Sequence, residues 1–96
     1  MVVVDHELHS WFLLRDGGGY VLDVNCNQSF VGFSVVLRLA PDEIARMDEQ
    51  GRRAVDDLAC AIQHSPGRYS ARCGDPALES ASLAAIREWK SSRSTA

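Results

Sequence analysis

A run of three glycines between two apolar segments is the feature that most restricts the fold of this chain. Gly17-Gly18-Gly19 separates residues 11–14 from residues 20–24, and glycine supplies the positive φ angles that tight hairpin turns require. The sequence therefore predicts a β-hairpin with a loop of either two or three residues, and one residue of slip exchanges the faces of a strand. With the shorter loop, one face carries Trp11, Leu13, Leu22, Val24 and Cys26. With the longer loop, Phe12 and Leu14 replace Trp11 and Leu13 on that face.

A third strand and a long helix are predicted next. Residues 31–39 alternate with period 2, the pattern of a strand with one buried face, and this pattern places Val36 on the solvent side. Pro41 suits the first position of a helix, so a helix is predicted to start near Ala40. Apolar residues then recur at helical spacing until Ser65-Pro66-Gly67 ends the helix. Gly51 lies in its middle, where it either bends the helix or lets it approach the sheet closely.

The last part of the chain predicts one short strand and one shorter helix. Residues 68–73 alternate between cationic or polar and less polar side chains, which indicates a strand at a sheet edge. Asp75-Pro76 opens a helix over residues 77–90, and residues 91–96 are expected to fray. The prediction is a single α+β domain over residues 1–96: an antiparallel sheet of about four strands, in the chain order βββαβα, packed against one long and one shorter helix. Residues 2–4 leave room for a further strand.

Charge and composition restrict the function classes. The 96 residues include 10 basic and 13 acidic side chains, a formal net charge of −3, without a cluster of Lys or Arg. Binding to DNA or RNA depends on several cations on one face, so no nucleic-acid partner is expected. The amino terminus lacks a signal-peptide pattern, and no apolar stretch approaches the roughly 18 residues of a membrane span. The sequence therefore predicts a cytoplasmic protein without a membrane partner, whose cysteines Cys26, Cys60 and Cys73 are reduced.

Two motifs with the spacing of metal ligands are incomplete. Asp23, Asn25 and Asn27 are spaced like the first ligands of a calcium loop, but the later positions of the loop lack the required glycine and bidentate carboxylate. His6 and His9 are three residues apart in an expected strand and so point to opposite faces, whereas the zinc-protease helix needs histidines four apart. The sequence therefore predicts no metal site and no cofactor.

One cysteine, Cys26, is a candidate for a catalytic nucleophile. Cys26 lies across the predicted hairpin from His9 or Ser10, depending on the register, and an adjacent histidine can activate a thiol. Nothing else in the sequence supports that chemistry, and an inert packed cysteine is the simpler interpretation. We therefore predict no catalytic residue and a function other than catalysis.

Opposite charges lie four residues apart along the predicted long helix. The four pairs are Asp48 with Arg52, Glu49 with Arg53, Arg52 with Asp56, and Arg53 with Asp57. Such pairs usually mark a solvated face, and each contributes about a few tenths of a kcal/mol. The same face offers carboxylates that attract a basic partner. The sequence is compatible with both interpretations, a solvated face and a surface for a basic partner.

Three segments carry a resemblance to a known class of proteins. Residues 11–16 (WFLLRD), 20–27 (YVLDVNCN) and 29–33 (SFVGF) resemble small immunity proteins encoded beside bacterial polymorphic toxins, including those of type VI secretion or contact-dependent systems. The resemblance covers about the first two thirds of the chain. It implies a cytoplasmic protein that binds one cognate toxin and blocks its active site or folding surface. On this hypothesis the partner surface would include Trp11, Tyr20 and Asp23, with aromatic anchors, or the acidic helix residues Asp48, Glu49, Asp56 and Asp57.

Two other classes of function stay open. The first is a small dimeric ligand-binding domain or enzyme, with a pocket between the sheet and the long helix and with Cys26 or His64 as its polar group. The second is a structural subunit or adaptor without a toxin partner. Trp11 and Trp89 are expected to be exposed, which raises the option of a homodimer.

Overall fold

The computed structural model of the protein describes residues 1–7, 10–28, 31–69 and 71–94. Four strands come first: β1 (Val2–Glu7), β2 (Trp11–Asp16), β3 (Gly19–Gln28) and β4 (Val31–Arg38). The helices α1 (Pro41–Gln50), α2 (Arg52–His64) and α3 (Pro76–Ser94) follow, with a short 3₁₀ helix η1 (Pro66–Tyr69) between α2 and α3. The α+β class is confirmed, whereas the predicted order βββαβα is wrong: the described chain has the order ββββααα.

The fourth strand of the sheet is β1 and not residues 68–73. The strand suggested at residues 2–4 is present and extends to Glu7, whereas residues 66–69 form η1 and a turn follows. In that turn the guanidinium of Arg72 donates hydrogen bonds to Glu43 Oε1 at 2.6 Å and to the carbonyl oxygen of Arg38 at 2.8 Å. Arg72 therefore joins the start of α1 to the end of β4. A six-residue alternation is too short to distinguish a strand from a turn that presents cations at intervals.

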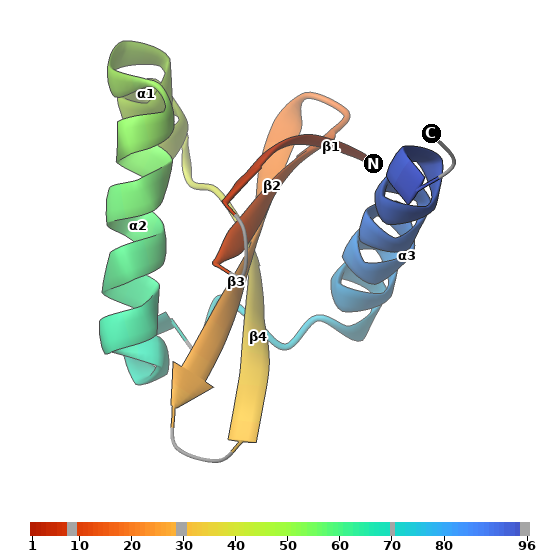
Figure 1. Ribbon diagram of the computed structural model, residues 1–96. Coiled ribbons are helices and arrows are strands. Elements are labelled where there is room, and N and C mark those ends of the chain that lie inside the picture. Colours follow the sequence, from red (N-terminus) through yellow and green to blue (C-terminus); the bar gives the residue numbers. More distant parts are fainter. Residues whose placement is uncertain (8–9, 29–30, 70, 95–96) are drawn as a thin grey trace.

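The sheet is antiparallel with the strand order β1-β2-β3-β4, and helices cover both of its faces. Figure 1 shows α1 and α2 on one side of the sheet and α3 on the other, which makes three layers. Val36 is only 4% exposed and packs with Leu14, Val21, Leu78 and Ile86 under α3. The prediction of a single buried face for β4 is therefore wrong, because α3 buries Val36 on the second face.

The hairpin between β2 and β3 has the shorter of the two predicted loops. Asp16 pairs with Gly19, which leaves Gly17 and Gly18 as the loop, and only Gly17 of these two has a positive φ, +62°. A positive φ at the first central position is the pattern of a type II′ turn, whose twist suits a hairpin. Trp11, Leu13, Leu22, Val24 and Cys26 accordingly share one face and form a core cluster with Val55, Ala59 and Ile62 of α2.

Gly51 divides the predicted long helix into α1 and α2. It has φ +68° and ψ −142°, and its N–H donates to the carbonyl oxygen of Met47 at 2.7 Å. Of the two roles that the sequence allowed for Gly51, the bend is the one observed. The bend lets α2 bury Ala54, Val55, Ala59 and Ile62 against the sheet, while α1 covers the edge of the core with the partly buried Ile44 and Met47.

The last helix is longer than predicted. Asp75 Oδ1 accepts hydrogen bonds from the N–H groups of Ala77 and Leu78, at 3.0 and 3.3 Å, which caps the helix start. α3 continues to Ser94, four residues beyond the predicted end, and residues 95–96 lie outside the described part of the chain. None of the helices in the described residues combines the length and apolar character needed to cross a membrane.

Candidate functional site

Trp11, a predicted partner anchor, lies in the core. Its side chain is 1% exposed, and its indole N–H donates to Asp56 Oδ1 at 2.8 Å. The guanidinium of Arg52 lies 5.1 Å from the centroid of the indole ring. The expectation that Trp11 is exposed is therefore wrong. Trp11 was one of two residues whose expected exposure suggested a homodimer, so it no longer supports that suggestion. A side chain with so little exposed surface offers a partner almost no area to contact.

Arg52 forms ion pairs across to β1. It bonds Asp5 Oδ1 at 2.8 Å and also Glu7 Oε2, and the hydrogen bond to Glu7 is the main reason that the pKa of Arg52 is raised. The sequence had placed Arg52 in pairs with Asp48 and Asp56 along one helix. The break at Gly51 interrupts the four-residue spacing between Asp48 and Arg52, so Arg52 is available to the sheet edge.

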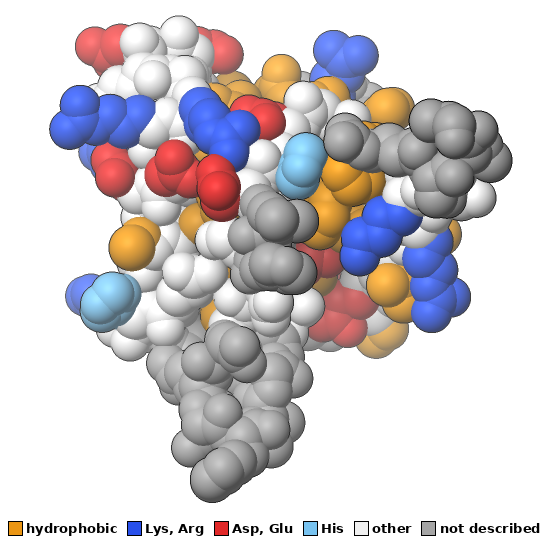
Figure 2. Space-filling view, viewed as in Figure 1, with side chains coloured by type: hydrophobic (Ala, Val, Ile, Leu, Met, Phe, Trp, Pro, Cys, Tyr) orange, Lys and Arg blue, Asp and Glu red, His pale blue; other side chains and the backbone are white. Residues whose placement is uncertain are grey.

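The other predicted helix residues lie at the surface. Asp48, Glu49, Asp56 and Asp57 are exposed on α1 and α2, together with Asp42. We call these five carboxylates the acidic face. Residues 41–64 contain six acidic and three basic side chains, so this segment holds the whole net charge of −3 and the rest of the chain is balanced. Figure 2 shows that basic side chains lie among the acidic ones over the helix pair, as the charge spacing in the sequence indicated.

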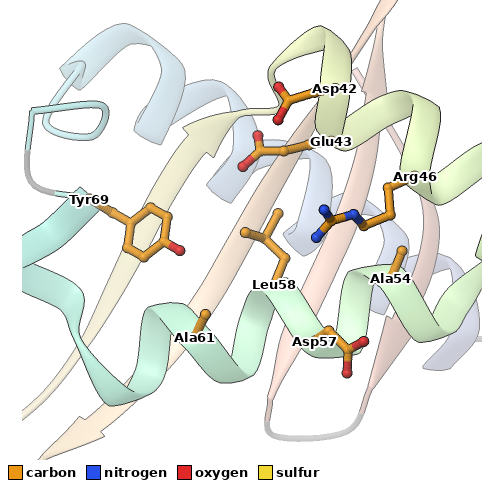
Figure 3. A pocket seen from close by; sticks show the side chains of 8 residues that line it. All are labelled: Asp42, Glu43, Arg46, Ala54, Asp57, Leu58, Ala61 and Tyr69. Atoms are coloured by element: carbon orange, nitrogen blue, oxygen red, sulfur yellow. The ribbon is translucent and has the colours of Figure 1, made fainter.

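A shallow cleft lies between α1 and α2 within this region. Its volume is about 220 Å³, and Figure 3 shows Asp42, Glu43 and Arg46 at the α1 side, Asp57 and Leu58 at the α2 side, and Tyr69 of η1. Glu43 is held in place by Arg72 and by the N–H of Ala40, which donates to Glu43 Oε1 at 2.7 Å. The hydrogen bond from Arg72 is the main cause that lowers the pKa of Glu43. The cleft is thus lined by charged side chains, of which Glu43 is fixed by its hydrogen bonds with Arg72 and Ala40.

The other two predicted partner residues, Tyr20 and Asp23, lie on opposite faces of the sheet. Tyr20 is half-buried against the core cluster under α1 and α2, together with Trp11. Asp23 is opposite Phe12 in the ladder and faces α3. Successive residues of a strand point to opposite faces, so these side chains do not form one surface. The strand-rich partner surface suggested by the sequence is therefore divided between two layers.

Asp23 lines a cavity of about 370 Å³ between the sheet and α3, which we call the Asp23 cavity. Its lining residues are His6, Ser10, Trp11, Phe12, Asp23, Asn25, Ser34, Leu83, Ile86, Trp89 and Lys90. Burial raises the pKa of Asp23, an effect that hydrogen bonds with Ser34 and Ser82 oppose. Glu79 raises this pKa further and Lys90 lowers it. In Figure 2, hydrophobic side chains gather between the sheet and α3, with acidic and basic side chains beside them.

Three rings form one wall of the Asp23 cavity. The centroid of His6 lies 5.7 Å from Phe12 in a stacked arrangement and 4.6 Å from Trp89 in an edge arrangement, and Phe12 lies 5.4 Å from Trp89. The ammonium of Lys90 lies 5.7 Å from the centroid of Phe12. These residues come from β1, β2 and α3, so only the folded chain brings them together.

The Asp23 cavity differs in position and in polar group from the pocket that the sequence suggests. The sequence suggests a pocket between the sheet and the long helix, with Cys26 or His64 as its polar group. Cys26 is fully buried in the core on the α2 side, where burial raises the pKa of its thiol. His64 lies at the exposed end of α2, with Nδ1 3.1 Å from the carbonyl oxygen of Cys60.

The sequence held a weak signal for the Asp23 cavity. Asp23 is a single acidic residue inside the apolar run 20–24, and Leu83, Ile86 and Trp89 recur every three residues. A carboxylate facing an apolar helix stripe indicates a mixed polar and apolar pocket. His6, Phe12, Ser34 and Lys90 carried no such signal, because their proximity arises from strand pairing and helix placement.

The incomplete metal motifs fall partly outside the described residues. Within residues 1–7, 10–28, 31–69 and 71–94, no group of three or more His, Cys, Asp or Glu side chains is arranged to hold a metal ion. Asp23, Asn25 and Asn27 lie within β3 and not in a loop. His9, which the zinc and thiol hypotheses required, is not among the described residues.

Comparison with known proteins gives no match. No family model, no curated protein and no solved structure matches the chain. The resemblance to immunity proteins therefore stays a hypothesis.

Proposed function

We propose that this protein is an immunity protein, which binds a cognate bacterial toxin in the cytoplasm and blocks its active site or folding surface. The observation that carries the proposal is the confinement of the net charge of −3 to residues 41–64, where five of the six carboxylates are exposed. Complementary charge steers partners together and fixes their orientation. A basic patch on the toxin is the surface that this acidic face fits.

The layered fold suits this role. The helix pair is anchored to the sheet by the contacts of Val55, Ala59 and Ile62 with the core, and by the ion pairs of Arg52 with β1. A carboxylate on a rigid helix loses little conformational freedom on binding. Asp56 has a structural task as well, because it accepts the hydrogen bond of Trp11. Variants that test binding by the acidic face must therefore leave Asp56 unchanged, so that they do not disturb the core.

The test is calorimetric binding between this protein and the C-terminal domain of the protein encoded by the adjacent upstream gene. Growth of cells that express that domain, with and without this protein, is the second readout. The proposal expects one-to-one binding and rescue of growth. Absence of both binding and rescue would contradict it.

A matched pair of variants locates the surface. Asp48→Asn with Glu49→Gln removes two charges from the acidic face, and Glu79→Gln with Glu88→Gln removes two charges from exposed positions on α3. We expect the first variant to slow association about tenfold at low salt and the second to leave it unchanged, because charges near an interface act mainly on the association rate. Equal effects of the two variants would show that net charge acts without a defined surface.

A further inference from the structure

We propose that the Asp23 cavity binds a small organic cation, namely a protonated amine, amidine or guanidine joined to a flat apolar group. This inference is independent of toxin binding, since the cavity lies on the face of the sheet opposite the acidic face. It assigns Asp23 as the counter-ion and the rings of Phe12 and Trp89 as the wall against which the ligand packs.

The burial of the two charged lining residues favours a cation, because the carboxylate of Asp23 is half-buried whereas the ammonium group of Lys90 belongs to an exposed residue. Asp23 is the one carboxylate among its described lining residues, and it lies half-buried beside Ser34 and Ser82. A cationic ligand would place its positive charge against this carboxylate, where the partly dry surroundings strengthen the attraction. A ligand carboxylate would instead be repelled by the negative charge of Asp23.

The aromatic wall favours the same class of ligand. The faces of aromatic rings carry partial negative charge and attract ammonium and guanidinium groups within about 6 Å. Lys90 already makes this contact with Phe12 at 5.7 Å, and its charge lowers the pKa of Asp23. The exposed Lys90 thus acts as an internal cation at the rim, and its flexible side chain can give way to a ligand.

The apolar remainder of the cavity determines the shape of the ligand. Leu83 is 48% exposed and Ile86 is buried beside it, so α3 presents an apolar surface next to the rings. A volume of about 370 Å³ lies at the lower end of the range of small-molecule pockets. A single ring that carries a cationic group is of suitable size.

Binding should depend on pH. Burial favours the neutral form of Asp23, and the charged groups around it are Glu79 and Lys90 on α3, with His6 of β1 also lining the cavity. A cation requires ionised Asp23, so affinity should increase as the pH rises through the raised pKa of this carboxyl. The rise should be absent in Asp23→Asn.

The experiment titrates the full chain with benzamidine and follows amide and indole NMR signals. Benzyl alcohol and benzoate serve as neutral and anionic probes of similar size. We expect saturable binding of benzamidine with shifts at Trp89 and Ser82, and at least tenfold weaker binding of the other two. The proposal fails if benzoate binds more tightly than benzamidine, or if benzamidine causes no saturable shifts up to millimolar concentrations.

Three variants test the assigned roles. Asp23→Asn should weaken benzamidine binding at least tenfold, whereas Lys90→Gln should strengthen it several-fold because the internal competitor is removed. Glu88→Gln, which removes one charge from α3 outside the cavity lining, should leave it unchanged. An unchanged affinity in Asp23→Asn, or a weaker one in Lys90→Gln, overturns the proposal. The circular dichroism and thermal transition of each variant verify that it is folded.

Discussion

At the scale of single residues, Asp23 and Glu43 show how the surroundings give the same functional group opposite properties. Burial under α3 raises the pKa of Asp23, whereas the hydrogen bond from Arg72 lowers the pKa of Glu43. Asp23 is therefore costly to ionise in the folded protein, and Glu43 is stabilised by its charge. Of the two, Asp23 fits a ligand-binding group, and Glu43 fits a structural one.

Asp23→Asn should alter the pH dependence of stability. Because the folded pKa is raised, the favourable contribution of neutral Asp23 is fully present below the ordinary value of 3.8 and is lost as the pH rises through the folded pKa. The variant should therefore gain stability relative to wild type as the pH increases from 3 toward 7. Urea unfolding at several pH values measures this difference. A difference that stays constant with pH would show that ionisation of Asp23 is not the cause.

Removal of the hydrogen-bond acceptor of Trp11 should destabilise the fold. Asp56→Ala leaves the buried indole N–H without its acceptor, which costs about 1–3 kcal/mol. Asp56→Asn keeps an acceptor oxygen at the same position and is the matched control. Urea unfolding of both variants measures the two losses. Equal losses would mean that the charge of Asp56, near Arg52, matters more than the hydrogen bond.

At the scale of the elements, Gly51 determines how the helical segment fits the sheet. Its φ of +68° ends α1 and starts α2 in a new direction, which brings Arg52 to β1. A non-glycine residue in this conformation is strained, even though a Cβ at this position would meet nothing within 4 Å. The helix break therefore depends on backbone freedom and not on space.

Gly51→Ala should lower the free energy of unfolding by about 1–3 kcal/mol, the usual cost of a strained backbone conformation. Gly18→Ala is the control, because Gly18 also has open space around its Cα but no positive φ. Thermal and urea unfolding measure both variants. A more stable Gly51→Ala protein would indicate that α1 and α2 can join into one straight helix without loss of packing.

At the scale of the whole molecule, two hydrophobic clusters lie on opposite faces of the sheet, and the strands of the sheet contribute residues to both. The larger cluster lies under α1 and α2, and the smaller one, which includes Leu14 and Val21, lies under α3. Adjacent residues of the same strands contribute to the two clusters, so loss of either cluster disturbs the strands that support the other.

Leu37→Ala and Leu14→Ala should therefore have similar consequences. Both leucines are fully buried, one in each cluster, and each truncation should cost about 2–5 kcal/mol in a single unfolding transition. Leu83→Ala, at a position that is 48% exposed, should cost much less. Urea unfolding followed by both far-UV circular dichroism and tryptophan fluorescence measures the transition. Two separate transitions in Leu14→Ala would show that α3 folds as an independent unit.

The sequence by itself determined the local elements. The period-2 runs, the glycine turn and the Pro41 helix start depend on interactions between neighbours in the chain, and β2, β3, β4, α1 and α2 lie where those signals indicated. The four-residue charge spacing likewise indicated exposed carboxylates at Asp48, Glu49, Asp56 and Asp57. The weak alternation at residues 68–73 was misleading, because the contacts of Arg72 with α1 and β4 are not visible in a local pattern.

Only the tertiary structure decided which faces are buried and which residues meet. The position of α3 on the second face buried Val36 and formed the Asp23 cavity, and the packing of α2 removed Trp11 from the surface. A strand alternates its side chains between two faces whatever lies above them, so the sequence pattern of one strand cannot show which layer will cover each face. The cavity lined by Asp23, Phe12 and Trp89 is a property of the assembled layers, because the hairpin pairs Phe12 with Asp23 but only the packing of α3 on the sheet brings Trp89 to them.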